Sequence, residues 1–416
     1  MLVGVVLLAA GAVVAAPAWA AALPEGCTGA VTSGNDTIVC TKNLGSGAVV
    51  DAGDGDDSIT VKADVRSGAR VLGGKGKDKI NVYDVGGFRC PGDDKGVGAT
   101  SYDGGLVDGG DGDDAITVGG GTRPGACDKA VPRDLVPVGN VGHNAVVRGG
   151  PGNDLVAAGS LGYIWEPDST DKSKTAAAWG GRLDGDAGDD TVTVVYATYG
   201  EHPDTADGVF GGIGNDKVTV GTATGLVDIM GDSTADGPGG GNDTITLTTG
   251  RGGLVYGGPG NDTIKGTGVM RLGTRLYGNA GNDTITAADL SQVASINGGP
   301  GDDVLSASKM NASDSASALI IGGSGNDKIE AGSLNSVLSE VRGDGDDPKD
   351  MTDGNLGTGK DIITVTTNKG VINAGNDDDT ITVADNSGTV DGGNGKDTCT
   401  VKKSSGKPTI TRCENK

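Results

Sequence analysis

A nine-residue unit, GGxGxDxUx with U an aliphatic residue, recurs through most of this 416-residue chain. Clear copies are GGPGNDTIK at 257–265, GNAGNDTIT at 278–286 and GGSGNDKIE at 322–330. One such unit cannot bury its own apolar residues, so stable folds with this kind of repeat stack many copies around a continuous core. The repeat therefore constrains the architecture more than any other feature of the sequence.

The residue type at each position of the unit has a physical reason. Position four is Gly in every copy except one, where Asp377 replaces it, and glycine allows the positive φ angles of a tight turn. Position eight is aliphatic except at Cys399, and an aliphatic residue between polar neighbours is typical of a short, half-buried strand. Position six is Asp in fifteen copies: Asp36, Asp57, Asp78, Asp114, Asp154, Asp190, Asp216, Asp243, Asp262, Asp283, Asp303, Asp327, Asp361, Asp379 and Asp397.

A second apolar residue lies two positions before most units, for example Val71, Leu276 and Ile320. Each repeat then supplies two short strands joined by one Gly-Asp turn. Successive aspartates are 18 to 40 residues apart, and 18 is twice the nine-residue unit, which indicates one coil per repeat with loops inserted in the longer ones. We predict an all-β fold, a parallel β-roll or β-solenoid of about 15 coils with one Gly-Asp turn per coil.

The unit resembles the calcium-binding repeat of the RTX (haemolysin-type) proteins, whose coils form a parallel β-roll. The resemblance covers residues 33 to about 400. It implies that calcium ions lie between successive turns, bound by backbone carbonyls and by the fifteen aspartates. Because only one turn per coil keeps the motif, it implies one column of ions where the RTX roll has two.

The charge of the chain fits this expectation. The net charge of −23 argues against nucleic-acid or anionic-membrane partners, which require a basic surface. Stacked carboxylates without counter-ions would repel one another. Fifteen turns leave at most 14 gaps, and 14 divalent cations would more than neutralise the whole excess. An acidic, solvated surface is the alternative, but it does not explain why Asp recurs at one position.

The N-terminus predicts secretion. Residues 1–20 are an apolar run ending in Ala18-Trp19-Ala20, which is typical of a signal peptide cleaved after Ala20, although no Lys or Arg precedes the run. An uncleaved anchor is the alternative. The solenoid then occupies residues 21–416, and we expect no membrane span after signal cleavage.

Six cysteines fit an oxidising compartment. Connectivity does not follow from sequence alone, but the cysteines form three local pairs. We predict bridges Cys27–Cys40, Cys90–Cys127 and Cys399–Cys413, of which the first and last would cap the ends of the stack.

Inserted loops are expected mainly at 83–106, 119–145, 160–182, 195–208 and 343–356, where most aromatic residues lie. In solenoids such loops gather on one face, often the binding face. Trp165 and Trp179 could bind a glycan or a cell-surface protein, or could cover the loop's own small core. The acidic segment 344–355 lacks the ligand pattern of an EF-hand and is not predicted to be a separate ion site.

The sequence contains no GxSxG, HExxH or Cys-His signature, so we predict a non-enzymatic, secreted calcium-binding protein with a structural, adhesive or surface-interaction role. One alternative is a β-solenoid lyase or epimerase acting on an anionic polysaccharide, with Glu166, Lys172, Tyr199 and His202 on one face. Another is an ice-binding solenoid, because Thr-x-Thr recurs beside the aliphatic position. That alternative is weaker, since position three, where ice-binding RTX-type solenoids carry a regular Thr, varies among nine residue types.

Overall fold

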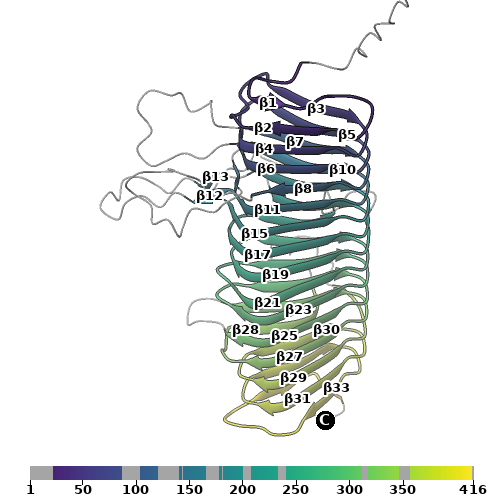
Figure 1. Cartoon of the computed structure of the whole chain (residues 1–416). Helices are drawn as coiled ribbons and strands as arrows, with labels where there is room; N and C mark the ends of the chain where they lie inside the picture. The colour runs from purple at the N-terminus through teal and green to yellow at the C-terminus, as the bar shows by residue number, and fades with distance from the viewer. Residues whose placement is uncertain are drawn as a thin grey trace, which may run out of the picture.

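The computed structural model describes residues 22–86, 104–119, 140–142, 144–164, 178–179, 181–199, 208–232, 240–311, 317–345 and 357–414. Within these ranges every regular element is a β-strand. The strands stack along one axis from the N-terminal to the C-terminal coil (Figure 1). The described part is a parallel β-solenoid, as the repeat predicted.

Two long sheets form the walls of the solenoid. Sheet A contains β1 (Cys27–Thr28), β2 (Thr37–Cys40), β4 (Ser58–Val65), β6 (Lys79–Val85), β8 (Ala115–Val118), β9 (Asn140–Val141), β11 (Leu155–Leu161), β15 (Thr191–Tyr199), β17 (Lys217–Gly225), β19 (Thr244–Arg251), β21 (Thr263–Arg271), β23 (Thr284–Ser291), β25 (Val304–Asn311), β27 (Lys328–Leu334), β29 (Ile362–Asn368), β31 (Thr380–Asn386) and β33 (Thr398–Val401).

Sheet B contains β3 (Val49–Asp54), β5 (Arg70–Lys75), β7 (Gly105–Asp111), β10 (Ala145–Pro151), β14 (Arg182–Ala187), β16 (Gly208–Ile213), β18 (Asp228–Asp232), β20 (Leu254–Pro259), β22 (Arg275–Ala280), β24 (Ser295–Pro300), β26 (Ala318–Ser324), β28 (Ser339–Asp344), β30 (Val371–Asn376), β32 (Thr389–Asn394) and β34 (Thr409–Thr411). A separate two-stranded sheet pairs β12 (Tyr163–Ile164) with β13 (Ala178–Trp179).

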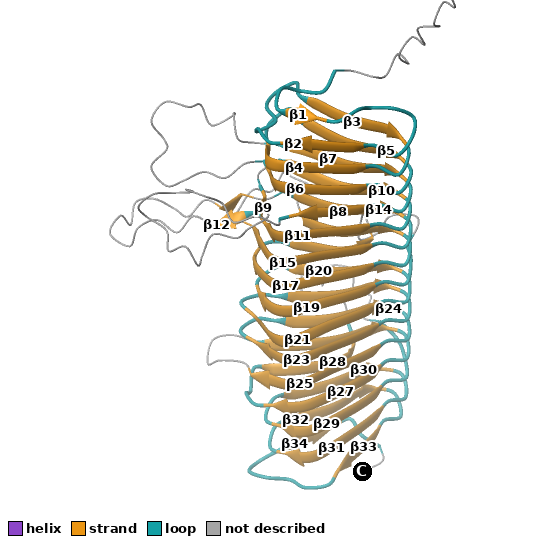
Figure 2. Cartoon of the chain, viewed as in Figure 1, coloured by secondary structure: helices purple, strands orange, loops and turns teal. Residues whose placement is uncertain are grey.

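The repeat sets the register of both sheets. In sheet A position seven of each unit pairs with position seven of the next, as in Thr244↔Thr263 and Thr263↔Thr284. The register holds across coils of different length, because Lys328 still pairs with Ile362 over a spacing of 34 residues. Insertions therefore leave the stack without shifting it, and loops lie along the edges of the walls (Figure 2).

The core lies between the two walls. Position eight faces inward, as predicted, and so does the residue two positions before the unit; Ile285 and Ile296 are examples, both fully buried. The structure adds two inward files that the sequence analysis missed. Position ten supplies residues such as Val61 and Leu247, and the end of the sheet A strand supplies others such as Met270.

Both ends of the stack carry a disulfide, and both were predicted. Cys27–Cys40 joins β1 to β2, the one antiparallel strand pair in sheet A. Cys399–Cys413 ties the last sheet A strand to the C-terminal segment. The predicted Cys90–Cys127 bridge lies outside the described residues.

The inserted segments are described only at their edges. Strand β15 continues to Tyr199, so residues 195–199 extend a wall strand where a loop was expected to begin. The same holds for residues 160 and 161, which end β11. The predicted signal peptide lies outside the described part of the chain. Among the described residues, no helix has the length and apolar character needed to span a membrane.

Candidate functional site

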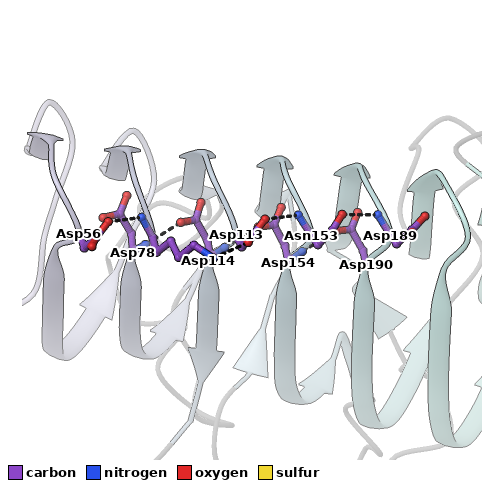
Figure 3. A network of polar contacts seen from close by, with 9 residues as sticks. Asp56, Asp78, Asp113, Asp114, Asn153, Asp154, Asp189 and Asp190 are labelled. Carbon is purple, nitrogen blue, oxygen red and sulfur yellow. Dashed lines mark hydrogen bonds and ion pairs between the residues drawn. The ribbon is translucent and has the colours of Figure 1, made fainter.

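The fifteen position-six aspartates form one continuous file, which we call the aspartate ladder. From Asp57 onward each lies in the turn between a sheet B strand and the next sheet A strand, and Asp36 precedes β2. The backbone N–H of each aspartate from Asp36 to Asp379 donates a hydrogen bond to Oδ1 of the aspartate in the following coil, at 2.6–3.0 Å. Figure 3 shows Asp78, Asp114, Asp154 and Asp190 aligned in this way. The sequence predicted these carboxylates to lie together, and they do.

The second oxygen of each carboxylate has no such partner. From Asp57 to Asp397, fourteen Oδ2 atoms are buried and have no hydrogen-bond partner among the described residues. These aspartates are at most 3% exposed. A buried, unpaired carboxylate oxygen is strongly unfavourable. The ladder therefore needs a cation or a proton beside each Oδ2.

The electrostatics point to the same need. Burial, reinforced in most of these turns by the charge of neighbouring aspartates, raises the pKa of Asp216, Asp262, Asp327 and Asp379 to about 8. The pKa of Asp283 rises to about 6, again through burial. In each turn the hydrogen bond to Oδ1 opposes the rise but does not cancel it. The folded turns thus disfavour the carboxylate charge unless something neutralises it.

In twelve coils a backbone carbonyl oxygen lies close to the unpaired Oδ2. Position one is Gly in these coils, with Gly231 and Gly343 taking that place in the coils of Asp243 and Asp361. A Cβ added there would lie 2.0–2.6 Å from Oδ2 of the same coil's aspartate and 2.0–2.7 Å from a backbone carbonyl oxygen of the next coil. At Gly278, for example, the two distances are 2.2 Å to Asp283 Oδ2 and 2.4 Å to Gly298 O. These distances are too short for a real side chain, so the place requires glycine and the two oxygens lie close to each other. We call this pair of atoms the turn oxygens.

The chemistry of the turn oxygens suits a hard divalent cation. One oxygen is charged and the other is a carbonyl, and calcium prefers such ligands. Among the described residues, no group of three or more His, Cys, Asp or Glu side chains comes together. A cation here would therefore be bound by single carboxylates and backbone carbonyls, not by a cluster of side chains.

Two of these fourteen coils differ at position one. Ala52 and Ala374 stand where the other twelve have Gly, and both are fully buried. The turns of Asp57 and Asp379 therefore hold a methyl group at a place where the glycine turns leave no room for one.

A second ladder on position five was missed by the sequence analysis. Here the backbone N–H donates to the side-chain oxygen of the preceding coil, the opposite direction to the aspartate ladder, as in Asn261→Asn242 and Asn282→Asn261, both at 2.7 Å. Figure 3 shows Asn153 and Asp189 in this outer ladder. The sequence does contain a pattern that could have predicted this ladder, since position five is Asn or Asp in every unit except those of Lys77, Lys360 and Lys396.

The ends of the aspartate ladder are closed by other residues. At the N-terminal end, the backbone N–H and hydroxyl of Thr32 donate to the two carboxylate oxygens of Asp36. At the C-terminal end, Asp397 N–H donates to Glu414 Oε2 at 2.6 Å. Glu414 thus takes the place of a sixteenth aspartate, and the neighbouring Cys413 disulfide holds it there. No repeat pattern marks either residue in the sequence.

The residues of the other hypotheses cannot be placed together. Glu166, Lys172, His202 and Trp165 lie outside the described residues. Tyr199 ends β15 and Trp179 pairs with Tyr163 in β13, but their side chains are not among those described.

Comparison with known proteins supports the fold. The X-ray structure of a hyperactive, Ca2+-dependent, β-helical antifreeze protein from an Antarctic bacterium is similar, with a TM-score of 0.51 and 19% identity over 83% of this chain and 84% of that chain. The likeness is one of fold. No family model and no curated protein matches the sequence.

Proposed function

We propose that this protein is a secreted, non-enzymatic, RTX-type calcium-binding solenoid with a structural, adhesive or surface-interaction role. The observation that carries the proposal is the file of fourteen buried Oδ2 atoms that have no hydrogen-bond partner among the described residues, twelve of which lie close to a backbone carbonyl oxygen of the next coil. The calcium dependence of the similar antifreeze protein supports the choice of metal.

The residues that would hold calcium are the ladder aspartates, through Oδ2, and the position-one residues of the next coil, through their carbonyls. Bound calcium would neutralise the carboxylate charge that the folded turn disfavours. The glycine at position one lets the backbone lie close to the carboxylate, and the hydrogen bond to Oδ1 fixes the carboxylate in one orientation. We propose one site for each gap of the aspartate ladder, fourteen at most.

Folding and calcium binding should be linked. The unfolded chain does not hold the turn oxygens together, so binding free energy becomes folding free energy. The apolar core alone is thin, with only 3% aromatic residues in the chain. We expect the chain to lose β structure and cooperative unfolding when calcium is removed.

Two measurements test the proposal. Far-UV circular dichroism in excess EDTA, in magnesium and in calcium should show an ordered β spectrum only in calcium, because magnesium gives up its water ligands reluctantly. Calcium content after dialysis should show many bound ions per chain, up to one for each of the fourteen gaps. An equally ordered spectrum in EDTA, with no bound calcium, would contradict the proposal.

Secretion rests on separate support. The two disulfides at the ends of the stack fit an oxidising compartment. Expression of the full chain with its N-terminal segment, followed by mass measurement of the exported product, tests cleavage after Ala20.

Ice binding is the second candidate, because the similar solved structure is an antifreeze protein. Outward files of Thr at positions seven and nine do run along sheet A, as at Thr244, Thr263 and Thr284. The files are interrupted by residues such as Lys328 and Ile362, so they offer no long regular face. Thermal hysteresis of the calcium-loaded protein decides between the two functions.

A further inference from the structure

The position-two residues of the unit form another close file inside the turn. A Cβ added at Gly74, Gly110 or Gly323 would lie 1.9–2.0 Å from the carbonyl oxygen of the position-two residue in the preceding coil. The same contact is made at Gly212, where the preceding carbonyl belongs to Asp186, at 2.1 Å. In regular coils, then, a backbone carbonyl oxygen fills this place.

Two coils depart from this rule in the same way. At Gly258 the nearest atom to the added Cβ is Asp232 Oδ2, at 2.1 Å, and at Gly375 it is Asp344 Oδ2, at 2.5 Å. Asp232 and Asp344 are the last residues of β18 and β28. Each stands shortly before a segment outside the described residues, 233–239 and 346–356. At both coils a carboxylate oxygen takes the place of the carbonyl oxygen.

The two carboxylates are buried and incompletely paired. Asp344 Oδ2 accepts the N–H of Asn376 at 2.6 Å, whereas its Oδ1 has no partner among the described residues. At the other coil the residue equivalent to Asn376 is Pro259, which has no N–H to donate. Neither oxygen of Asp232 makes a hydrogen bond of normal geometry within the described chain, although Gly241 N–H is near enough to moderate its pKa.

Both side chains belong to the same electrostatic environment as the aspartate ladder. They are only 5% and 6% exposed. The charge of Asp232 raises the pKa of Asp216, Asp243 and Asp262. The charge of Asp344 does the same for Asp327, Asp361 and Asp379. Each insertion coil therefore brings a second carboxylate toward a turn that already holds one.

We propose that Asp232 and Asp344 each supply a second carboxylate ligand to a divalent cation in the turn, creating two sites that bind calcium more tightly than the regular sites. The inference rests on the proposed function, because it assumes that the aspartate ladder binds calcium. Affinity for calcium rises with the number of charged ligands. A buried carboxylate without a donor or a cation would be costly, and Asp232 has no donor of normal geometry among the described residues.

The arrangement also gives a reason for an acid where a glycine is usual. The sheet B pairing with the next coil ends two residues before each acid, at Met230↔Tyr256 and Arg342↔Asn373. A carboxylate at this point supplies an oxygen against the next coil and adds a charge. The two tight sites would then anchor the coils whose turns are interrupted.

The test counts the tightest calcium ions by competition with a chromophoric chelator. The wild-type chain should hold two ions about tenfold or more tightly than the remainder, because each has one extra charged ligand. Asp232→Asn and Asp344→Asn preserve shape but remove the charge, and each should lose one tight ion and keep the others. Asp186→Asn is the matched control. Asp186 also stands at position two, but its backbone carbonyl, and not its side chain, contacts the next coil.

The outcomes separate this inference from the proposed function. Two tight ions in every variant, or none in the wild type although weaker calcium binding persists, would overturn the inference alone. Absence of calcium binding in all four proteins would overturn both. If Asp232→Asn fails to give a β spectrum in calcium, Asp232→Glu replaces it. This variant keeps the charge, so it should also keep the tight ion. Loss of that ion in Asp232→Glu would count against the inference.

Discussion

The most direct test of the aspartate ladder is the substitution Asp283→Asn, because it should change stability in opposite directions with and without calcium. Asp283 is 1% exposed. Its Oδ1 accepts the N–H of Asp262 at 2.7 Å, and its Oδ2, which has no partner among the described residues, lies near Gly298 O. Asparagine keeps the Oδ1 acceptor, removes the charge and places an amide donor near the carbonyl.

The size of the effect follows from the pKa. Burial raises the pKa of Asp283 from 3.8 to about 6. At pH 7.5 this corresponds to about 3 kcal/mol of unfavourable charge burial in the metal-free fold. Water near the narrow turn screens part of the charge, so we expect Asp283→Asn to raise the free energy of unfolding by about 1–2 kcal/mol in EDTA. In saturating calcium a tenfold weaker site should lower it by about 1.4 kcal/mol.

The assay is urea unfolding at pH 7.5, followed by circular dichroism, in EDTA and in calcium. If the metal-free wild type is too disordered to give a transition, a stabilising osmolyte is added equally to all samples. Asp283→Ala is the control: it also removes the charge but strands the N–H of Asp262, so it should be about 1–3 kcal/mol less stable than Asp283→Asn in both conditions. A change of the same sign for Asp283→Asn in both conditions would refute the reasoning.

Three further predictions follow from the same turns. Folding raises the pKa of the twelve ladder aspartates from Asp78 to Asp379 from 3.8 to about 6–8, so the metal-free fold binds more protons than the unfolded chain. Its melting temperature should therefore be highest near pH 4, fall as pH rises to about 8, and lose this dependence in calcium. Gly298→Ala should destabilise the calcium-loaded fold by about 1–3 kcal/mol, because the added Cβ would lie 2.1 Å from Asp303 Oδ2 and 2.5 Å from Gly322 O; an unchanged melting temperature would contradict the close packing of this turn. Replacing Cys399 and Cys413 by Ser should destabilise the C-terminal coils by about 3 kcal/mol, seen as faster amide exchange confined to them.

The sequence predicted the fold well because the repeat couples each residue type to one structural role. The inward residues at position eight and before the unit, the Gly-Asp turn and the two end disulfides all follow from local chemistry. The exceptions obey the same physics. Asp186, Asn279 and Asp377 replace glycines at positive φ, and Asn and Asp tolerate that region better than other side chains.

What the sequence did not predict depends on contacts between coils. The direction of each ladder, with position six bonding forward and position five backward, follows from how one turn stacks on the next and not from composition. The closeness of each ladder Oδ2 to a carbonyl oxygen of the next coil in the glycine turns follows only from the stacking of the coils. Likewise Glu414 resembles no repeat residue, yet it accepts the last N–H of the ladder.

These contacts make the ladder cooperative along the stack. From Asp57 onward each aspartate accepts through Oδ1 the N–H of the preceding coil, and in the glycine turns its Oδ2 lies near a carbonyl oxygen of the following coil. Both of these oxygens are acceptors, so the proposed cation between them would connect the coils. A coil that loses its carboxylate leaves an unpaired N–H in the coil before it. Ordering should therefore spread between neighbouring coils and stop at the ends, where Thr32 and Glu414 supply the missing partners. On this reasoning, a Glu414→Ala chain should fray from its C-terminal coil even with both disulfides intact.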